Sequence, residues 1–243
     1  MSTIPLDLGY TYFKFTFKKI IVMKILTGAI LSVFISFSLS AQNISLSAKN
    51  LVPNKVSMKE TKLEGRKAMK VVIDTTIKTF DEPSFVKLTD MNFHDGTIEV
   101  KVLSKFITNA PDWARGFIGV AFRINDDNSK FECFYIRPSN GRAEDQVRRN
   151  HSTQYFSYPD HKFSDFRKTD PEKYESYADM EMNEWIAMKI IVKGDHAKLF
   201  INDAKQPCLV VNDLKYGADL AGSIGLWVGN WTEGYFSDLK ISK

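Results

Sequence analysis

The sequence predicts an all-β protein built as a two-sheet antiparallel sandwich. Apolar and polar side chains alternate over short runs along most of the chain, which is the period of a strand with one buried face. After residue 50, no segment carries the apolar stripe of an amphipathic helix. Turn signals separate the runs, as Gly194-Asp195 does between two of them. About ten such strands in one chain fit two packed sheets better than one open sheet.

The clearest strands lie in the middle and at the end of the chain. Ile118, Val120 and Phe122 share one face of a run, while the residues between them share the other. The expected strands cover residues 44–48, 69–74, 97–102, 116–124, 131–137, 185–193, 196–202, 206–211, 223–228 and 234–242. Because no repeat or low-complexity linker interrupts this pattern, we expect one domain over residues 42–243.

The first 41 residues have the layout of a secretory signal peptide. Lysines between residues 18 and 24 precede an apolar run at 25–39, and small residues at 38–41 supply a cleavage point. The apolar run is shorter than the roughly 20 residues of a membrane span. Met23 begins a more typical signal, and an uncleaved N-terminal anchor is the alternative. We therefore expect export to the periplasm or the extracellular space, without stable membrane insertion of the mature chain.

Charge and cysteine content narrow the function classes. The chain has 33 Lys and Arg residues and 29 Asp and Glu residues. The leader contains four of the basic residues and one of the acidic residues, so the mature part has a net charge of +1. Bulk charge therefore gives no case for a nucleic-acid partner. Cys133 and Cys208 both lie in apolar strand patterns, where free buried thiols are expected, although an oxidising compartment would permit pairing.

No metal-type Cys/His spacing occurs, so no cofactor is expected. One segment, Asn-Asp-Asp-Asn at 125–128, offers oxygen ligands of the kind that Ca²⁺ takes. It also lies between two expected strands, where Asn and Asp favour a turn for backbone reasons. A turn is the preferred interpretation and a Ca²⁺ site the alternative.

Several motifs resemble the concanavalin A-like lectin/glucanase superfamily. They are FHDGTIEV at 93–100, GFIGVAFR at 116–123, EW at 184–185, VKGDHAKLFIN at 192–202 and GSIGLW at 222–227. In particular, residues 90–243 are similar to laminin-G-like jelly rolls and to the 3-keto-disaccharide hydrolase-like group of secreted bacterial proteins. The resemblance implies a concanavalin A-like jelly-roll sandwich. It implies function only loosely, because such sandwiches host lectins, hydrolases and adhesion modules.

The connection at 138–184 is the expected place of the site. It has almost no periodicity and is rich in arginine, aromatic and carboxylate side chains. A loop of this length in a compact domain is usually functional. Its Arg148 and Arg149 form a basic pair suited to a uronate or a sulfate. A network of salt bridges that stiffens the loop is the alternative.

The strands beside this loop supply further candidates. Alternation places Arg123, Tyr135, Arg137 and Trp227 on one face if their strands are neighbours, and such a surface stacks and hydrogen-bonds sugars. An ordinary charged solvent face is the alternative. The expected substrate-binding residues are Arg123, Tyr135, Arg137, Arg149, Gln154, Tyr155, Trp227 and Glu233.

Asp145 and Glu175 are the carboxylates expected to act if the protein is a hydrolase, with His151 as a candidate base. A glycosidase needs two carboxylates roughly 5–10 Å apart. The paired-carboxylate strand signature of laminarinase-type glucanases is absent, which counts against a retaining endoglucanase. The sequence thus favours an exported carbohydrate-active protein that binds, and in one version hydrolyses, a glycan or glycoside. A non-catalytic lectin-like module and a protein-binding adhesion domain are the alternatives.

Overall fold

The structure is a computed structural model that describes residues 41–243. All but the last residue of the expected leader, including the alternative start at Met23, lies outside the described part. No helix in the described range is long and apolar enough to cross a membrane.

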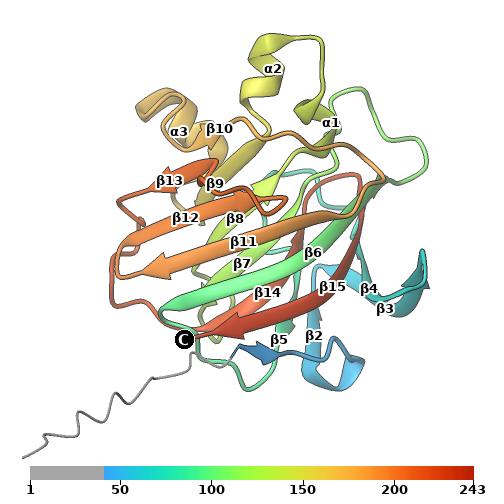
Figure 1. Ribbon diagram of the computed structural model, residues 1–243, viewed down its shortest axis with the longest axis vertical. Helices are drawn as coiled ribbons and strands as arrows, with labels where there is room; N and C mark the ends of the chain where they lie inside the picture. Colours follow the sequence, from blue (N-terminus) through green and yellow to red (C-terminus); the bar gives the residue numbers. More distant parts are fainter. Residues whose placement is uncertain (1–40) are drawn as a thin grey trace, which may run out of the picture. The chain divides into compact units, whose positions relative to one another are not determined.

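Two antiparallel sheets pack face to face, which confirms the predicted sandwich (Figure 1). Sheet A has the order β13 (Leu209–Val211), β12 (His196–Ile201), β11 (Ile186–Lys193), β6 (Gly96–Phe106), β15 (Thr232–Ser242), β4 (Arg66–Ile73) and β3 (Val56–Leu63), and β1 (Gln42–Asn43) also pairs with β15. Sheet B has the order β10 (Glu175–Ser176), β9 (Thr153–Tyr158), β8 (Phe131–Ile136), β7 (Ile118–Ile124), β14 (Ser223–Val228), β5 (Phe85–Leu88) and β2 (Leu51–Asn54).

Four short helices complete the described elements. They are the 3₁₀ helix η1 (Ala48–Asn50) and the α-helices α1 (Pro138–Gly141), α2 (Gln146–Asn150) and α3 (Phe163–Thr169). The three α-helices gather at one end of the sandwich, at the top of Figure 1. The helices therefore mark the end of sheet B at which β8 finishes and β9 begins.

The main core lies between the two sheets. Ile118, Val120 and Phe122 are fully buried on the inner face of β7, as their alternation predicts. The two sheets approach closely near Gly234 of β15. A Cβ atom added at this glycine would lie 2.6 Å from Val228 Cγ1 and 2.9 Å from Ile118 Cδ1, both of which belong to sheet B. Sheet B consequently has an inner face that packs on sheet A and an outer face that points away from it.

Two expectations about secondary structure are wrong. Residues 44–48 do not form a strand: only Gln42–Asn43 pairs with β15, and the chain then enters η1. The connection at 138–184 is not structureless, because it contains α1, α2, β9, α3 and β10. The helices have four, five and seven residues, too few for a visible stripe. Strand β9 is buried on both faces along most of its length, so its residues do not alternate.

The expectation that Arg123 shares a face with Tyr135 is also wrong. Ser223 pairs with Ile124 and Gly225 with Ala121, so two residues of β7 lie opposite Ile224 alone. This β-bulge, with φ of 54° at Arg123, breaks the alternation. The Arg123 side chain is fully buried at the end of the sandwich away from Arg137's strand end.

There the Arg123 guanidinium ties together three loops. It donates to the carbonyl oxygens of His94, Gly194 and Gly217 at 2.8–3.0 Å and to Asp95 Oδ1 at 3.1 Å. These contacts give Arg123 a structural role, because every acceptor belongs to the protein and no part of the side chain is exposed.

We therefore predict that Arg123→Met lowers the free energy of unfolding by about 3 kcal/mol, since buried carbonyl groups lose a charged donor. Urea-induced unfolding measures this change. Arg66→Met is the matched control, because Arg66 makes a partly exposed ion pair with Asp238 whose loss costs about 0–1 kcal/mol. Equal losses in the two variants would contradict the structural role of Arg123.

Candidate functional site

One cross-strand row crosses the whole outer face of sheet B. Strand pairing aligns Glu175 with Gln154, Gln154 with Tyr135, Tyr135 with Gly119, Gly119 with Trp227, and Trp227 with Phe85. Gly119 has no side chain, so the rings of Tyr135 and Trp227 meet across it with centroids 4.9 Å apart. The predicted neighbourhood of Tyr135 and Trp227 on one face is therefore confirmed.

Most of this face is covered by protein rather than open to solvent. The segment between β4 and β5 crosses it, and the Glu82 carbonyl oxygen accepts a hydrogen bond from Trp227 Nε1 at 2.8 Å. Trp227 is only 1% exposed and also packs on Phe156. The expected open surface around Trp227 is thus a closed aromatic layer, in which Trp227 serves packing.

The polar end of the row is organised by Arg137, which follows β8 directly. Its side chain is buried and donates four hydrogen bonds: to Glu175 Oε1 (2.8 Å), Tyr135 Oη (2.8 Å), Gln154 Oε1 (2.9 Å) and the His151 carbonyl oxygen (2.9 Å). The guanidinium also lies 5.0 Å from the centre of the Tyr135 ring. Each acceptor comes from β8, β9, β10 or the residue that ends α2, so one cation holds these elements in register.

Glu175 receives a second cation from helix α3. Arg167 donates to both of its carboxylate oxygens, and His151 Nε2 lies 3.8 Å from Glu175 Oε2. Burial opposes ionisation, but the hydrogen bonds of Arg167 and the charges of Arg137 and Arg167 win and hold the pKa of Glu175 below its usual value. Glu175 is therefore a carboxylate at neutral pH and is unsuited to donate a proton.

Asp81 is a second buried carboxyl group at this end, and sequence patterns did not indicate it. It is 4% exposed, and its Oδ2 accepts a hydrogen bond from the Phe163 backbone N–H at 2.8 Å. Burial raises the pKa of Asp81 to about 6, although the Phe163 hydrogen bond and the charge of Arg137 act in the opposite direction. Two carboxyl groups near Arg137 thus have pKa values displaced in opposite directions.

A cavity of about 410 Å³ opens above Arg137, and we call it the Arg137 pocket. Its lining consists of Phe80, Trp113, Arg115, Phe117, Tyr135, Arg137, Asn140, Asp145, Val147, Arg148, His151, Phe163 and Arg167. Aromatic rings form one part of this lining, and arginine, histidine and amide groups form another. Phe163 lies beside both Arg137 and Arg167, at 5.9 and 5.2 Å from its ring centre.

The structure brings together six of the expected site residues. Tyr135, Arg137, Asp145 and His151 line the Arg137 pocket, while Gln154 and Glu175 lie beneath it in contact with Arg137. Asp145 caps α2, since its Oδ1 accepts from the backbone N–H groups of Val147 and Arg148.

Three other expected residues lie elsewhere, as do Arg123 and Trp227. Tyr155 points to the opposite side of β9 from Gln154, and its hydroxyl donates to Glu132 Oε2 at 2.6 Å. Arg149 donates to the Ala143 carbonyl oxygen and to Gln146 Oε1, away from the pocket. Glu233 belongs to β15 of sheet A and forms an ion pair with Lys70.

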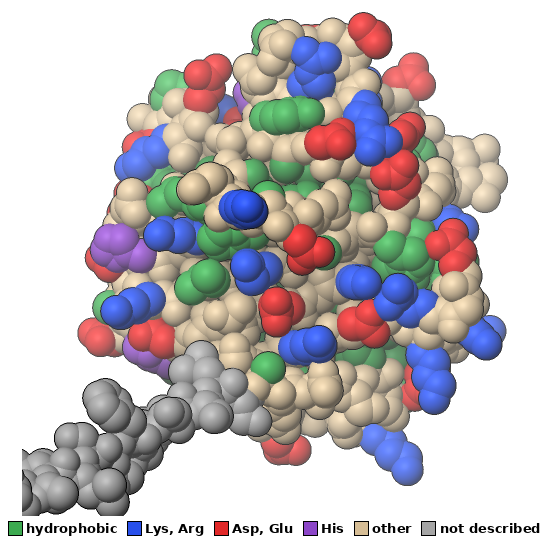
Figure 2. All heavy atoms as spheres, viewed as in Figure 1, with side chains coloured by type: hydrophobic (Ala, Val, Ile, Leu, Met, Phe, Trp, Pro, Cys, Tyr) green, Lys and Arg blue, Asp and Glu red, His purple; other side chains and the backbone are tan. Residues whose placement is uncertain are grey.

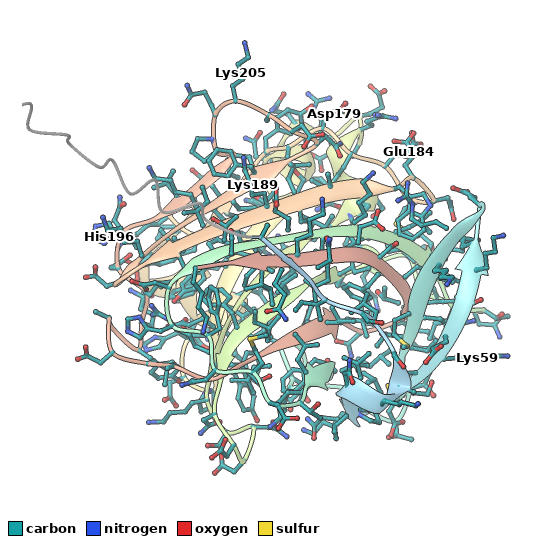
Figure 3. The ribbon with its side chains drawn as sticks, turned by 60° about the horizontal axis from the view of Figure 1, so that its bottom comes forward. Lys59, Asp179, Glu184, Lys189, His196 and Lys205 are labelled. Atoms are coloured by element: carbon teal, nitrogen blue, oxygen red, sulfur yellow. The ribbon has the colours of Figure 1, made fainter. Side chains whose placement is uncertain are left out.

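A second and larger hollow, of about 1100 Å³, lies over the outer face of sheet A beside residues 43–47. Lysine side chains are scattered over this face (Figure 2), and Lys189 points outward from β11 (Figure 3). Every charged side chain that lines this hollow is exposed or half-buried. The Arg137 pocket, by contrast, has a buried Arg and Tyr in its floor, and it is the better candidate despite its smaller volume.

Cation ligands are sparse in the described part of the chain, where no group of three or more His, Cys, Asp or Glu side chains converges. The segment 125–128 forms the hairpin between β7 and β8, in which Asn125 Oδ1 accepts from the Lys130 N–H and Asp127 Oδ1 from the Ser129 N–H. Cys133 lies in β8 and Cys208 precedes β13 in the other sheet, and both are free thiols.

Comparison with known proteins supports the resemblance seen in the sequence. Residues 51–242 match the family described as the 3-keto-alpha-glucoside-1,2-lyase-like domain. Among curated proteins, none matches the chain.

Solved structures match the chain at low sequence identity. The carbohydrate binding module CBM66 from Bacillus subtilis superposes with a TM-score of 0.53 at 15% identity, covering 79% of this chain and 96% of that one. A protein of unknown function with a galectin-like fold from Bacillus subtilis has a TM-score of 0.48 at 13% identity, covering 80% and 89%. A putative glycosyl hydrolase from Parabacteroides distasonis has a TM-score of 0.44 at 10% identity, covering 83% and 99%. The first of these confirms the predicted fold class.

The raised pKa of Asp81 predicts a specific pH dependence. Between about pH 4 and pH 6 the unfolded chain loses this proton before the folded protein does, so the contribution of Asp81 to stability falls as the pH rises. In Asp81→Asn this titration is absent, and Asn tolerates the φ of 52° found here. The free energy of unfolding of the variant relative to the native protein should therefore rise by about 2 kcal/mol from pH 4 to pH 7.

Urea unfolding at several pH values measures this difference. Asp127→Asn is the control of opposite sign, because hydrogen bonds from Ser129 lower the pKa of that exposed carboxyl. A difference for Asp81→Asn that stays constant over this pH range would show that Asp81 titrates normally in the folded protein.

Proposed function

The chain belongs to the 3-keto-alpha-glucoside-1,2-lyase-like family, and from this premise we propose that it binds a glycoside in the Arg137 pocket. The observation that carries the proposal is the mixed lining of the pocket, which combines aromatic rings with arginine, histidine and asparagine side chains. Sugars present C–H groups that stack on aromatic faces and hydroxyl groups that pair with such polar side chains. The volume of about 410 Å³ lies in the range of small-ligand sites.

The aromatic wall gives the sharpest test of binding. Trp113 is 43% exposed and meets the Phe80 ring edge-on at 5.3 Å, so its removal should leave the fold intact. We predict that Trp113→Ala weakens binding of methyl α-glucoside about fivefold, which corresponds to roughly 1 kcal/mol of lost stacking. Isothermal titration calorimetry measures the affinity.

Trp185→Ala is the matched control. Trp185 packs beside Leu103 and Tyr235 of sheet A, with Arg66 5.5 Å from its ring centre. This variant should bind the glucoside as the native protein does. Binding that is insensitive to Trp113 but sensitive to Trp185 would move the site to sheet A.

A second, catalytic function is favoured by the position of His151. Its backbone carbonyl oxygen accepts from Arg137 and from Asn140 Nδ2, and its ring lines the pocket above the ionised Glu175. An imidazole placed in this way can act as a general base, and the carboxylate would stabilise the imidazolium that forms.

The family description suggests the reaction. In a 3-keto-glycoside the proton on C2 is acidic because it is next to the carbonyl group. We propose that His151 takes this proton, that the C2–H electron pair forms a C1=C2 double bond, and that the C1–O bond breaks. The aglycone leaves as an alcohol after gaining a proton from solvent. Addition of water to the double bond would give net hydrolysis.

His151→Gln should therefore lower turnover of p-nitrophenyl 3-keto-α-glucoside by about 100-fold or more, with little change in affinity. Release of nitrophenol measures turnover, and deuterium at C2 should slow it in the native protein. Asp145→Asn should retain most of the activity, because this side chain is already engaged by the N–H groups of α2.

Loss of turnover in Asp145→Asn with full activity in His151→Gln would assign the base to Asp145 instead. Binding without turnover in the native protein would leave the lectin-like function and exclude the lyase reaction for this substrate.

A further inference from the structure

Two arginines of the Arg137 pocket differ from the others in their partners. Of the arginines that line the pocket, Arg137 and Arg167 pair with Glu175, but in the described residues no carboxylate lies within 4.0 Å of the guanidinium of Arg115 or Arg148. Both of these side chains are half-buried. A partly desolvated cation without an ion-pair partner is unusual in a folded protein.

The hydrogen bonds of Arg115 and Arg148 all go to neutral groups. Arg115 Nη1 donates to the carbonyl oxygens of Asp112 and Ala114. Arg148 donates from Nε to Asn140 Oδ1 and from Nη2 to Ser139. These contacts orient both guanidinium groups and bring no carboxylate within ion-pair distance of them, although the more distant charge of Asp112 acts favourably on Arg115. Among the described residues, none accepts a hydrogen bond from Nε or Nη2 of Arg115 or from Nη1 of Arg148.

The positive charges at this end also repel one another. Burial, followed by the charges of Arg148 and Arg137, lowers the pKa of Arg115. A bound anion would relieve this repulsion. Arg137 is not the primary partner of such an anion, because its own charge is matched by Glu175 and its Nη1 and Nη2 groups donate four hydrogen bonds to protein acceptors.

Asp145 is the one acidic side chain in the lining, and it does not neutralise this pair. It is exposed, and its Oδ1 accepts from the backbone N–H groups of Val147 and Arg148. The pocket therefore combines an aromatic wall for a sugar ring with two guanidinium groups free to bind an anion. Guanidinium groups bind carboxylate and sulfate oxygens through paired hydrogen bonds.

We propose that Arg115 and Arg148 form an anion subsite in the Arg137 pocket, which binds the carboxylate or sulfate group of an acidic sugar. This inference rests on the proposed glycoside binding and adds the class of ligand. The shared chemistry is a sugar ring with one anionic substituent, planar in a uronate and tetrahedral in a sulfate ester.

The test compares three ligands that differ only at C6: methyl α-glucoside, methyl α-glucuronide and methyl α-glucoside 6-sulfate. Calorimetry with the full chain should show that at least one of the two acidic ligands binds roughly 10- to 100-fold more tightly than the neutral one, as hydrogen bonds between charged groups predict. Added salt should reduce this preference. The stronger of the two acidic ligands identifies the uronate or the sulfate ester as the natural group.

Arg115→Gln and Arg148→Gln should each lower affinity for the preferred acidic ligand more than affinity for methyl α-glucoside, and so remove most of the preference, and Arg115→Lys should restore part of it. Arg142→Gln is the matched control. Arg142 belongs to the same connection as Arg148, residues 138–184. At the surface it pairs with Asp179, Glu181 and Glu184. Asp179 and Glu184 lie at the same end of the molecule (Figure 3). Circular dichroism checks that each variant is folded.

Equal affinity for the neutral and both acidic ligands in the native protein would overturn the anion subsite and leave the proposed function standing. A preference that survives in the Arg115→Gln/Arg148→Gln double variant would also overturn it. Failure of all three ligands to bind would contradict the proposed function, and the inference would fail with it.

Discussion

The buried ion pair between Arg137 and Glu175 is the interaction on which the rest of the site depends. Burying two charges is costly, and such a pair persists only where further hydrogen bonds satisfy both groups. Here Tyr135, Gln154 and the His151 carbonyl oxygen accept the other hydrogen bonds from Nη1 and Nη2 of Arg137, and Arg167 donates to Glu175 from α3. Because the partners come from successive strands of sheet B and from the helices at its end, the pair fixes the floor of the pocket and the position of His151 above it.

The aromatic layer on the outer face of sheet B is covered by protein at Trp227. The segment between β4 and β5 provides this cover, and its Phe80 lines the Arg137 pocket. The proposed site therefore lies beside the covered part of the face, in the pocket above Arg137. The same segment contains Asp81, whose buried carboxyl group interacts with the charge of Arg137. One stretch of chain therefore both covers Trp227 and contributes an ionisable group with a raised pKa.

Much of the fold could be predicted from the sequence, because alternation in runs such as 116–124 reports a strand with one buried face. The same rule failed at Arg123, where a bulge inserts one extra residue, and in β9, which is buried on both faces. Within the site, Tyr135, Arg137, Gln154, Glu175 and His151 could be proposed because they lie in or beside the long connection. Asp81 and Arg115 could not, because they come from loops distant in the chain, and their meeting with Arg137 is a property of the packed sheets alone.

The Arg137 pocket, and not the hollow on sheet A, is the proposed place of ligand binding. Amide hydrogen exchange of the full chain, with and without saturating methyl α-glucoside, tests it most directly because exchange reports protection locally. We predict that the ligand slows exchange in residues 113–117 and 137–151 and leaves β11 and β12 unchanged. Protection confined to β11, β12 and the segment 43–47, which borders the larger hollow on sheet A, would contradict the account.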